Sequence, residues 1–137
     1  MAEKIETFLM FEGRCEEAIN TYVSLFKDAV IERIQRYGQE APGGAAGKVM
    51  VAAFSLKGQT FMAIDSPIKH DFGFTPAISL FVDCTDEAEI DHLFAALSEG
   101  GKIMMPLDRY PFSRKFAWIA DKFGVSWQLS LVGDPAS

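Results

Sequence analysis

The chain has 137 residues, of which 49% are hydrophobic and 23% charged, and its formal net charge is −6. Length and composition are typical of a soluble globular protein with one substantial core. The acidic balance argues against a nucleic-acid surface, because phosphate binding requires a basic patch. The nearest concentration of positive charge is Arg109 with Arg114 and Lys115, which is too small for one.

The cellular location is indicated by what the sequence lacks. The N-terminus does not resemble a secretory signal, and no apolar run approaches the roughly 18 residues of a membrane span. Cys15 and Cys84 are the two cysteines of the chain. We therefore expect a cytoplasmic protein with two reduced thiols and no membrane partner.

The first half predicts one helix and four strands. A mostly apolar run over residues 5–11 indicates a strand, and Glu12-Gly13-Arg14 a turn. A helix follows, because apolar residues recur with a 3.6-residue period at Ala18, Ile19, Tyr22, Val23 and Phe26. Three strand-like runs come next, over residues 30–37, 49–56 and 60–65.

The second half predicts the same elements in the same order. Residues 77–82 alternate as a strand, and Thr85-Asp86 can cap a helix that ends at Gly100-Gly101. The apolar face of this helix carries Ile90, Leu93, Phe94 and Leu97. Strands are expected at 102–107, 114–120 and 125–131.

The two halves repeat one pattern. Each apolar position of the second helix lies 71 positions after its counterpart in the first, as Ile90 does after Ile19. Two amphipathic helices can match by chance, but strand count and closing turns also agree. We predict an α+β fold of duplicated βαβββ modules, at about residues 1–66 and 76–132 of a single domain.

Two polar loops interrupt this pattern, over residues 38–47 and 66–76. Loops of this length commonly serve as lids, binding loops or interface arms. The glycine-rich first loop is not a phosphate-binding loop, because Pro42 occupies the position of its first glycine and Val49 that of its Ser or Thr.

Several segments resemble one protein family. They are the run Asp121 to Gln128 (DKFGVSWQ), Phe61 to Asp65, Phe11 to Ala18 and Ile78 to Cys84. The chain resembles PhnB-like proteins of the glyoxalase/bleomycin-resistance/extradiol-dioxygenase superfamily, which are often labelled 3-demethylubiquinone-9 3-methyltransferases. The resemblance implies a half-open mixed β-barrel and a homodimer. The label's chemistry is not supported, because the sequence has no Gly-rich strand-turn-helix suited to S-adenosylmethionine.

The resemblance also implies where metal-using members hold a divalent ion. The four positions fall on Thr7, Met62, Ala77 and Gln128. Thr and Gln are weak ligands, Ala is none, and a thioether does not suit a hard ion. We therefore expect no catalytic metal and no other cofactor.

Strand alternation predicts a cavity in the barrel. Its candidate lining residues are Thr7, Met62, Ser79, Phe81, Trp118, Ser126, Gln128 and Ser130. Loop candidates are His70, Phe72, Tyr110 and Arg114, of which Arg114 suits an anionic ligand. The aromatic residues Tyr110, Phe112, Phe116 and Trp118, with Phe72 and Phe74, suit either a gate to the cavity or a dimer seam.

Three functions remain open. The first is metal-independent binding of a small, partly apolar molecule in the cavity. The second is an enzyme that uses general acid–base chemistry, with Asp65, His70 or Asp108 as candidate groups. The third is a structural dimer module without a ligand. The sequence identifies no catalytic residue and no particular ligand.

Overall fold

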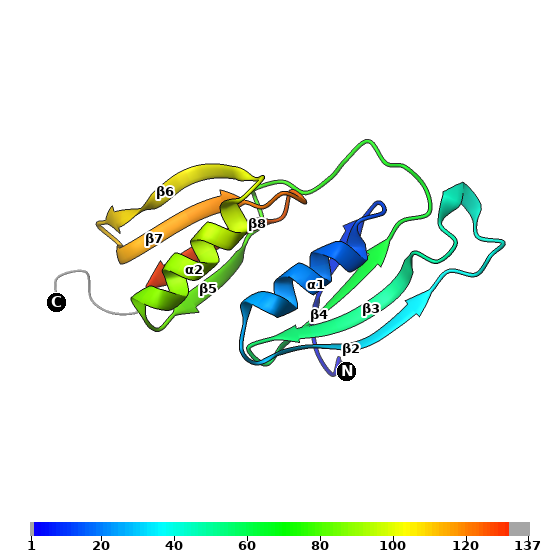
Figure 1. The fold of residues 1–137 in the computed structure, drawn as a ribbon, viewed down its shortest axis with the longest axis horizontal. Coiled ribbons are helices and arrows are strands. Elements are labelled where there is room, and N and C mark those ends of the chain that lie inside the picture. The colour runs from blue at the N-terminus through cyan, green and yellow to red at the C-terminus, as the bar shows by residue number, and fades with distance from the viewer. Residues whose placement is uncertain (1, 132–137) are drawn as a thin grey trace. The chain divides into compact units, whose positions relative to one another are not determined.

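The computed structural model describes residues 2–131, which form two compact units, one ending at Asp71 and the other beginning at Phe72 (Figure 1). The boundary between the units falls inside the polar segment 66–76. No helix among the described residues is long and apolar enough to cross a membrane.

The first unit contains one helix and a four-stranded mixed sheet. Its elements are β1 (Thr7–Phe11), α1 (Cys15–Leu25), β2 (Ala29–Arg36), β3 (Val49–Leu56) and β4 (Gln59–Asp65), with a short 3₁₀ turn at Pro42–Gly44. The strand order is β1-β4-β3-β2. The pair β1–β4 is parallel, and the other two pairs are antiparallel.

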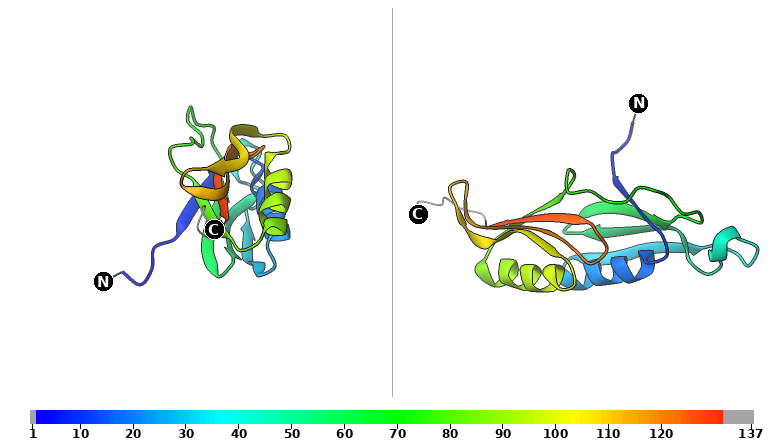
Figure 2. Two further views of the ribbon diagram at one scale, coloured as in Figure 1. Left: turned by 90° about the vertical axis from the view of Figure 1, so that its left-hand side faces the viewer. Right: turned by 90° about the horizontal axis from the view of Figure 1, so that it is seen from above.

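The second unit repeats this plan. Its elements are β5 (Leu80–Cys84), α2 (Glu87–Ser98), β6 (Lys102–Tyr110), β7 (Ser113–Ala120) and β8 (Ser126–Leu131), in the strand order β5-β8-β7-β6. Again the first strand pairs in parallel with the last. Figures 1 and 2 show each helix lying along one face of its own sheet. The predicted α+β fold with duplicated βαβββ modules is confirmed.

The two helices also bury matching positions. Ile19 and its counterpart Ile90 are fully buried, and so are Tyr22 and Leu93. The next pair, Val23 and Phe94, is half-buried in both helices, and the last pair, Phe26 and Leu97, is buried again. The 71-residue offset therefore describes the same packing of helix on sheet in both units.

Two strand boundaries differ from the prediction by three residues, and the other boundaries agree within two. The strand expected at 77–82 begins only at Leu80, because Thr75 folds the chain before it into a turn: its carbonyl accepts from Ile78 N, and its hydroxyl from Ala77 N. The strand expected to end at 107 continues to Tyr110 despite Pro106. An edge strand tolerates a proline, because its outward N–H needs no partner.

The long loop of the first unit is packed against its own module. Ala45 is buried, and Gly47 N donates to Tyr37 O at 3.1 Å. Gly43 has a positive φ of 67°, and a Cβ on it would lie 2.3 Å from Pro67 O. Only glycine therefore fits where this loop meets the segment after β4.

Each sheet has one face covered by its helix and one face that its helix leaves uncovered, which we call the open face. In the first unit the rings of Phe54 and Phe61 stack at 5.3 Å, and Phe54 meets Tyr22 of α1. In the second unit Lys115 of β7 pairs with Glu87 and Asp91 of α2. These contacts identify the helix side of each sheet.

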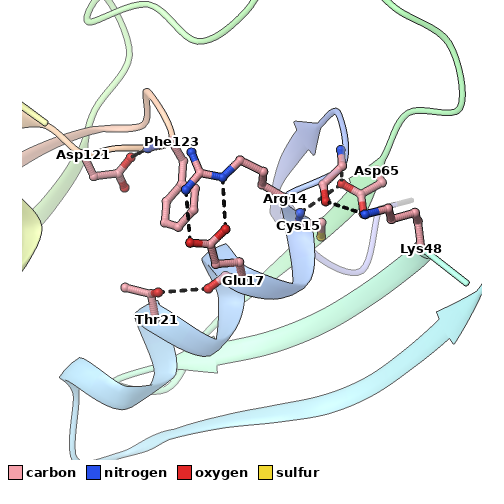
Figure 3. Close-up of polar contacts among 9 residues, drawn as sticks. Arg14, Cys15, Glu17, Thr21, Lys48, Asp65, Asp121 and Phe123 are labelled. Atoms are coloured by element: carbon pink, nitrogen blue, oxygen red, sulfur yellow. Dashed lines mark hydrogen bonds and ion pairs between the residues drawn. The ribbon is translucent and has the colours of Figure 1, made fainter. Parts of the chain in front are cut away.

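A buried carboxylate holds the first unit together. Asp65, 2% exposed at the end of β4, accepts hydrogen bonds from Gly13 N (2.7 Å) and Cys15 N (2.9 Å) through Oδ1. Its Oδ2 accepts from Val49 N at 3.3 Å. Figure 3 shows Asp65 beside Cys15 at the first turn of α1. Since Arg14 at the N-cap makes no side-chain cap, Asp65 supplies this function from a distant strand.

Replacing Asp65 tests this role. Asp65→Asn leaves one of the three buried N–H donors without a carboxylate acceptor, and we expect the free energy of unfolding to fall by about 2 kcal/mol. Urea unfolding followed by circular dichroism measures it. The control Asp71→Asn changes an exposed side chain and should shift stability by less than about 0.5 kcal/mol. Equal effects of the two substitutions would contradict the assignment.

Candidate functional site

The open face of the second sheet carries three rows of side chains that run across its strands. Register partners share a face, so each row can be followed from strand to strand. The rows are Asp83–Ser130–Phe116–Asp108, then Phe81–Gln128–Trp118–Met105, then Ser126–Ala120–Lys102. Five of the eight predicted lining residues stand in these rows.

A polar network joins four of the predicted residues. Ser79 Oγ and Ser126 Oγ lie 2.7 Å apart, and Trp118 Nε1 donates to Ser126 Oγ at 2.9 Å. Gln128 Nε2 donates to Ser79 Oγ at 3.3 Å. Ser79 precedes β5, so the network links this segment to β7 and β8. The indole and the amide are thereby fixed side by side, with Phe81 beyond Gln128 in the same row.

Aromatic rings gather where β6 turns into β7. Tyr110 stacks on Phe112 at 5.6 Å, and both rings meet Phe116 edge-on, at 5.9 and 4.9 Å. Tyr110 Oη donates to Pro106 O, which fixes its ring. Phe116 is buried under this group, whereas Phe112 is 62% exposed. Ser130, at the same end of the open face, bonds to Ser113 across 2.9 Å.

The remaining loop candidates lie apart from these rows. His70 belongs to the first unit, where its Nε2 lies 2.9 Å from Ser66 Oγ and its backbone N donates to Glu12. Phe72 is the first residue of the second unit and is exposed. Arg114 follows Ser113 where the β6–β7 register shifts, and its Nε is buried without a partner among the described residues.

Thr7 and Met62 lie on opposite faces of the first sheet. Thr7 is the register partner of Phe61, whose ring packs on the α1 side, while Met62 pairs with Phe8. Phe8, Met10, Met62 and Ile64 share the open face of this sheet. Among the candidate lining residues of the first unit, only Met62 therefore reaches that face.

The four positions that the resemblance implies for a metal do not suit one. Thr7 faces away from Met62, Ala77 lies in the turn before β5, and the Gln128 amide is hydrogen-bonded to Ser79. Within residues 2–131, no three His, Cys, Asp or Glu side chains gather to hold an ion. Glu6, the residue before β1, has its Oε2 3.3 Å from Lys4 Nζ. Thr7, Met62, Ala77 and Gln128 include no carboxylate or imidazole, the groups that a divalent ion binds most readily.

The acid–base candidates are occupied by backbone groups or held apart. Both carboxylate oxygens of Asp65 accept from buried backbone N–H groups. Asp108 is exposed, and its Oδ1 accepts from Arg109 N at 2.7 Å. The Ser66 hydroxyl donates to Ile68 O at 2.9 Å, so the imidazole of His70 is better placed to donate to Ser66 than to activate it.

Both cysteines are buried and free. Cys15 begins α1, where the helix dipole favours a thiolate. Burial nevertheless raises the pKa of Cys15 to about 12, with further increases from the charges of Asp65 and Glu16. The thiol therefore stays protonated at neutral pH.

A cavity of about 310 Å³ lies at the start of α1. It is lined by Gly13, Glu16, Ala46, Gly47, Lys48, Val49 and Asp65. Its charged groups already have partners within the unit. Glu16 forms a two-pronged ion pair with Arg36 at 2.7 and 2.8 Å, which lowers the pKa of Glu16, and Lys48 donates to Gly13 O.

Sequence reasoning missed how Asp83, Phe116 and Asp108 line up with Ser130. Strand alternation in β5 and β7 does predict that Asp83 and Phe116 face away from the helix. Asp108 follows irregularities in the β6–β7 register, so the count of residues from Met105 does not give its face.

Comparison with known proteins places this geometry in a family. A family model described as 3-demethylubiquinone-9 3-methyltransferase matches residues 3–130. The solved structure of a PhnB protein from Bacillus cereus, provisionally described as a 3-demethylubiquinone-9 3-methyltransferase, is similar at 55% identity. It covers 95% of this chain and 100% of its own, with a TM-score of 0.92. No curated protein matches the chain.

Two further solved structures extend the comparison. Protein PA1353 from Pseudomonas aeruginosa is 28% identical, covers 97% of this chain and 100% of its own, and gives a TM-score of 0.84. A glyoxylase/bleomycin resistance protein/dioxygenase domain from Frankia sp. is 13% identical and covers 98% of this chain and 94% of its own. Its TM-score of 0.69 shows a common fold.

The raised pKa of Cys15 predicts an inert thiol. In a Cys84→Ala background, Cys15 should react with iodoacetamide at pH 8 at least a hundredfold more slowly in the folded protein than in urea. The folded pKa is raised above its unfolded value, so this group's contribution to stability is complete below about pH 9 and is lost as pH rises towards 12. Mass spectrometry over time measures the labelling, and equal rates in both states would contradict the prediction.

Proposed function

Since the chain belongs to the 3-demethylubiquinone-9 3-methyltransferase family, a PhnB-like family with the vicinal-oxygen-chelate fold, we propose that it binds a small, partly apolar molecule on the open face of its second module. The observation that carries this proposal is the row Phe81–Gln128–Trp118 with its network to Ser126 and Ser79.

This row combines the groups that small-molecule sites use. Neighbouring strands lie about 4.8 Å apart, so Phe81 and Trp118 flank Gln128 at distances that suit contact with one planar ligand. The Gln128 amide donates to Ser79, which leaves its oxygen without a partner among the described residues. Phe81 is 56% exposed, so its ring is accessible to a ligand. A bound ligand would cover it.

We further propose that binding requires no metal. This proposal rests on the donor chemistry of Thr7, Met62, Ala77 and Gln128, which suits a divalent ion poorly. We also propose that the protein is not a methyltransferase. Each four-stranded sheet has one parallel and two antiparallel strand pairs. Nucleotide-type cofactors are instead bound at the Gly-rich turn of an open parallel sheet.

A ligand screen tests the binding proposal. Purified protein is screened against a metabolite library that includes S-adenosylmethionine, with saturable thermal stabilisation as the readout. For any ligand found, Phe81→Ala and Gln128→Ala should each weaken binding about tenfold by calorimetry, because each removes a stacking or hydrogen-bonding partner. The control Val30→Ala removes an exposed apolar side chain from the first unit and should leave affinity unchanged.

The same samples separate the alternatives. Metal analysis should find less than stoichiometric zinc, nickel or manganese, and EDTA should not change the ligand affinity. Stoichiometric metal, or affinity lost in EDTA and restored by a divalent ion, would refute metal independence. A ligand whose affinity is insensitive to both Phe81→Ala and Gln128→Ala would refute the proposed site. Consumption of the ligand over time would identify an enzyme.

We propose that the protein is cytoplasmic and forms a homodimer. The support for a dimer is the resemblance to proteins that pair, together with the exposed Phe112 ring beside Tyr110 and Phe116. Aromatic residues are enriched in interfaces. Sedimentation equilibrium should give twice the chain mass of 15.2 kDa, and Phe112→Ser should weaken association at least tenfold. A concentration-independent monomer would contradict this.

A further inference from the structure

The hydrogen-bond network behind the row Phe81–Gln128–Trp118 can be followed from donor to acceptor. Trp118 Nε1 can only donate, and it donates to Ser126 Oγ at 2.9 Å. Ser126 is 2% exposed, and Ser79 Oγ, 2.7 Å away, is the acceptor that the structure offers for its hydroxyl proton. Ser79 Oγ also accepts from Gln128 Nε2 at 3.3 Å, which fills both of its lone pairs. The network therefore starts in the buried Ser126 and ends at the Gln128 amide.

One edge of the Gln128 amide is left unused by this network. A primary amide has two N–H donors and a carbonyl acceptor, and the bond to Ser79 engages one N–H. The second N–H and Oε1 have no partner among the described residues. Oε1 can be reached from outside, because the buried side-chain N and O atoms that lack a hydrogen bond in residues 2–131 belong to Glu6 and Arg114. Gln128 therefore presents an acceptor and a donor side by side.

The two rings of the row determine how a planar molecule meets this edge. Phe81 and Trp118 are the register partners of Gln128 on its two sides, so their backbones stand about 10 Å apart by two strand spacings. One flat ring in contact with both needs about 7–8 Å between the two aromatic side chains, which this spacing allows. A planar ligand held between them stands upright on the sheet and meets the Gln128 amide with its edge. The hydrogen-bonding groups on that edge therefore decide the fit.

We propose that this face selects a planar heterocycle whose edge carries a hydrogen-bond donor next to an acceptor, as the N–H and C=O of a lactam do. The inference rests on the proposed function of the same face. Gln128 Oε1 accepts from the N–H of the ligand, and the second N–H of Gln128 donates to the ligand carbonyl. Glutamine reads adenine in DNA through a paired contact of the same kind. A ring that offers acceptors alone leaves Oε1 unpaired and binds more weakly.

Three uncharged bicyclic probes test this selection. 2-Quinolinone carries a lactam, 1-methyl-2-quinolinone keeps the carbonyl but lacks the N–H, and quinoline offers a ring nitrogen as acceptor alone. Each is titrated into the full-length protein while the Trp118 indole N–H signal is followed by NMR, assigned with Trp118→Phe. 2-Quinolinone should bind about three- to tenfold more tightly than either of the others, the gain expected from a hydrogen bond that they cannot make. Because no probe is charged, the acidic and basic side chains of this face do not separate them.

A substitution of Gln128 then locates the effect. Gln128→Met keeps the length of the side chain and removes its hydrogen-bonding groups, so the three probes should bind within about twofold of one another. The control Gln59→Met makes the same change at an exposed position at the start of β4 in the first unit and should keep the preference for 2-quinolinone. The Trp127 indole signal, whose N–H donates to the buried Asp121, checks that the second module of each variant is folded.

The outcomes separate this inference from the proposed function. Equal binding of the three probes to the unsubstituted protein would overturn recognition of the ligand edge and leave the proposed binding face standing. A preference for 2-quinolinone that persists in Gln128→Met would do the same, because it would come from the shape of the probes. Absence of any Trp118 shift with all three probes would overturn both.

Discussion

The first module depends on one buried carboxylate. Asp65 ends β4, yet its oxygens accept from the turn before α1, from the first residue of that helix and from the first residue of β3. A buried carboxylate is costly unless hydrogen bonds satisfy it, and here three backbone donors do so. The same bonds fix where α1 begins, because Arg14 offers it no side-chain cap. Both oxygens of Asp65 therefore accept structural hydrogen bonds, and any ligand must be bound by other side chains.

The second module is held by hydrogen bonds between residues that are close in the sequence. Its helix is capped locally, with Asp86 Oδ1 accepting from Glu89 N and Glu89 Oε1 accepting from Thr85 N. Its buried carboxylate, Asp121, accepts from Phe123 N and Val125 N in its own turn and from the Trp127 indole. The two modules thus share strand order and helix packing, while the polar contacts that secure them arose at different positions.

The fold was predictable because the spacing of apolar residues along the sequence indicates each helix and strand. Alternation in β8 separated Trp127 and Leu129 from Gln128 and Ser130, and the structure places these pairs on opposite faces of the sheet. What sequence could not supply was register. The resemblance assigned Thr7 and Met62 to one site, but Thr7 packs on the helix side of the sheet. A shift of one residue in the alignment moves a side chain to the other face of its strand. The row that joins Asp83 to Asp108 spans four strands, two of which meet through irregular pairing.

The open faces of the two sheets have different chemistry on one scaffold. The first carries Phe8, Met10, Met62 and Ile64, and the second carries hydroxyl, amide, indole and carboxylate groups. Because each helix packs on the other side, a substitution at an exposed position of an open face, such as Phe8 or Phe81, leaves the packing of helix on sheet intact. A duplicated gene can therefore diversify one copy of this surface while the other stays conservative. Ligand preference in such a protein can change over evolution faster than its fold, and family membership alone is a weak guide to what a given member binds.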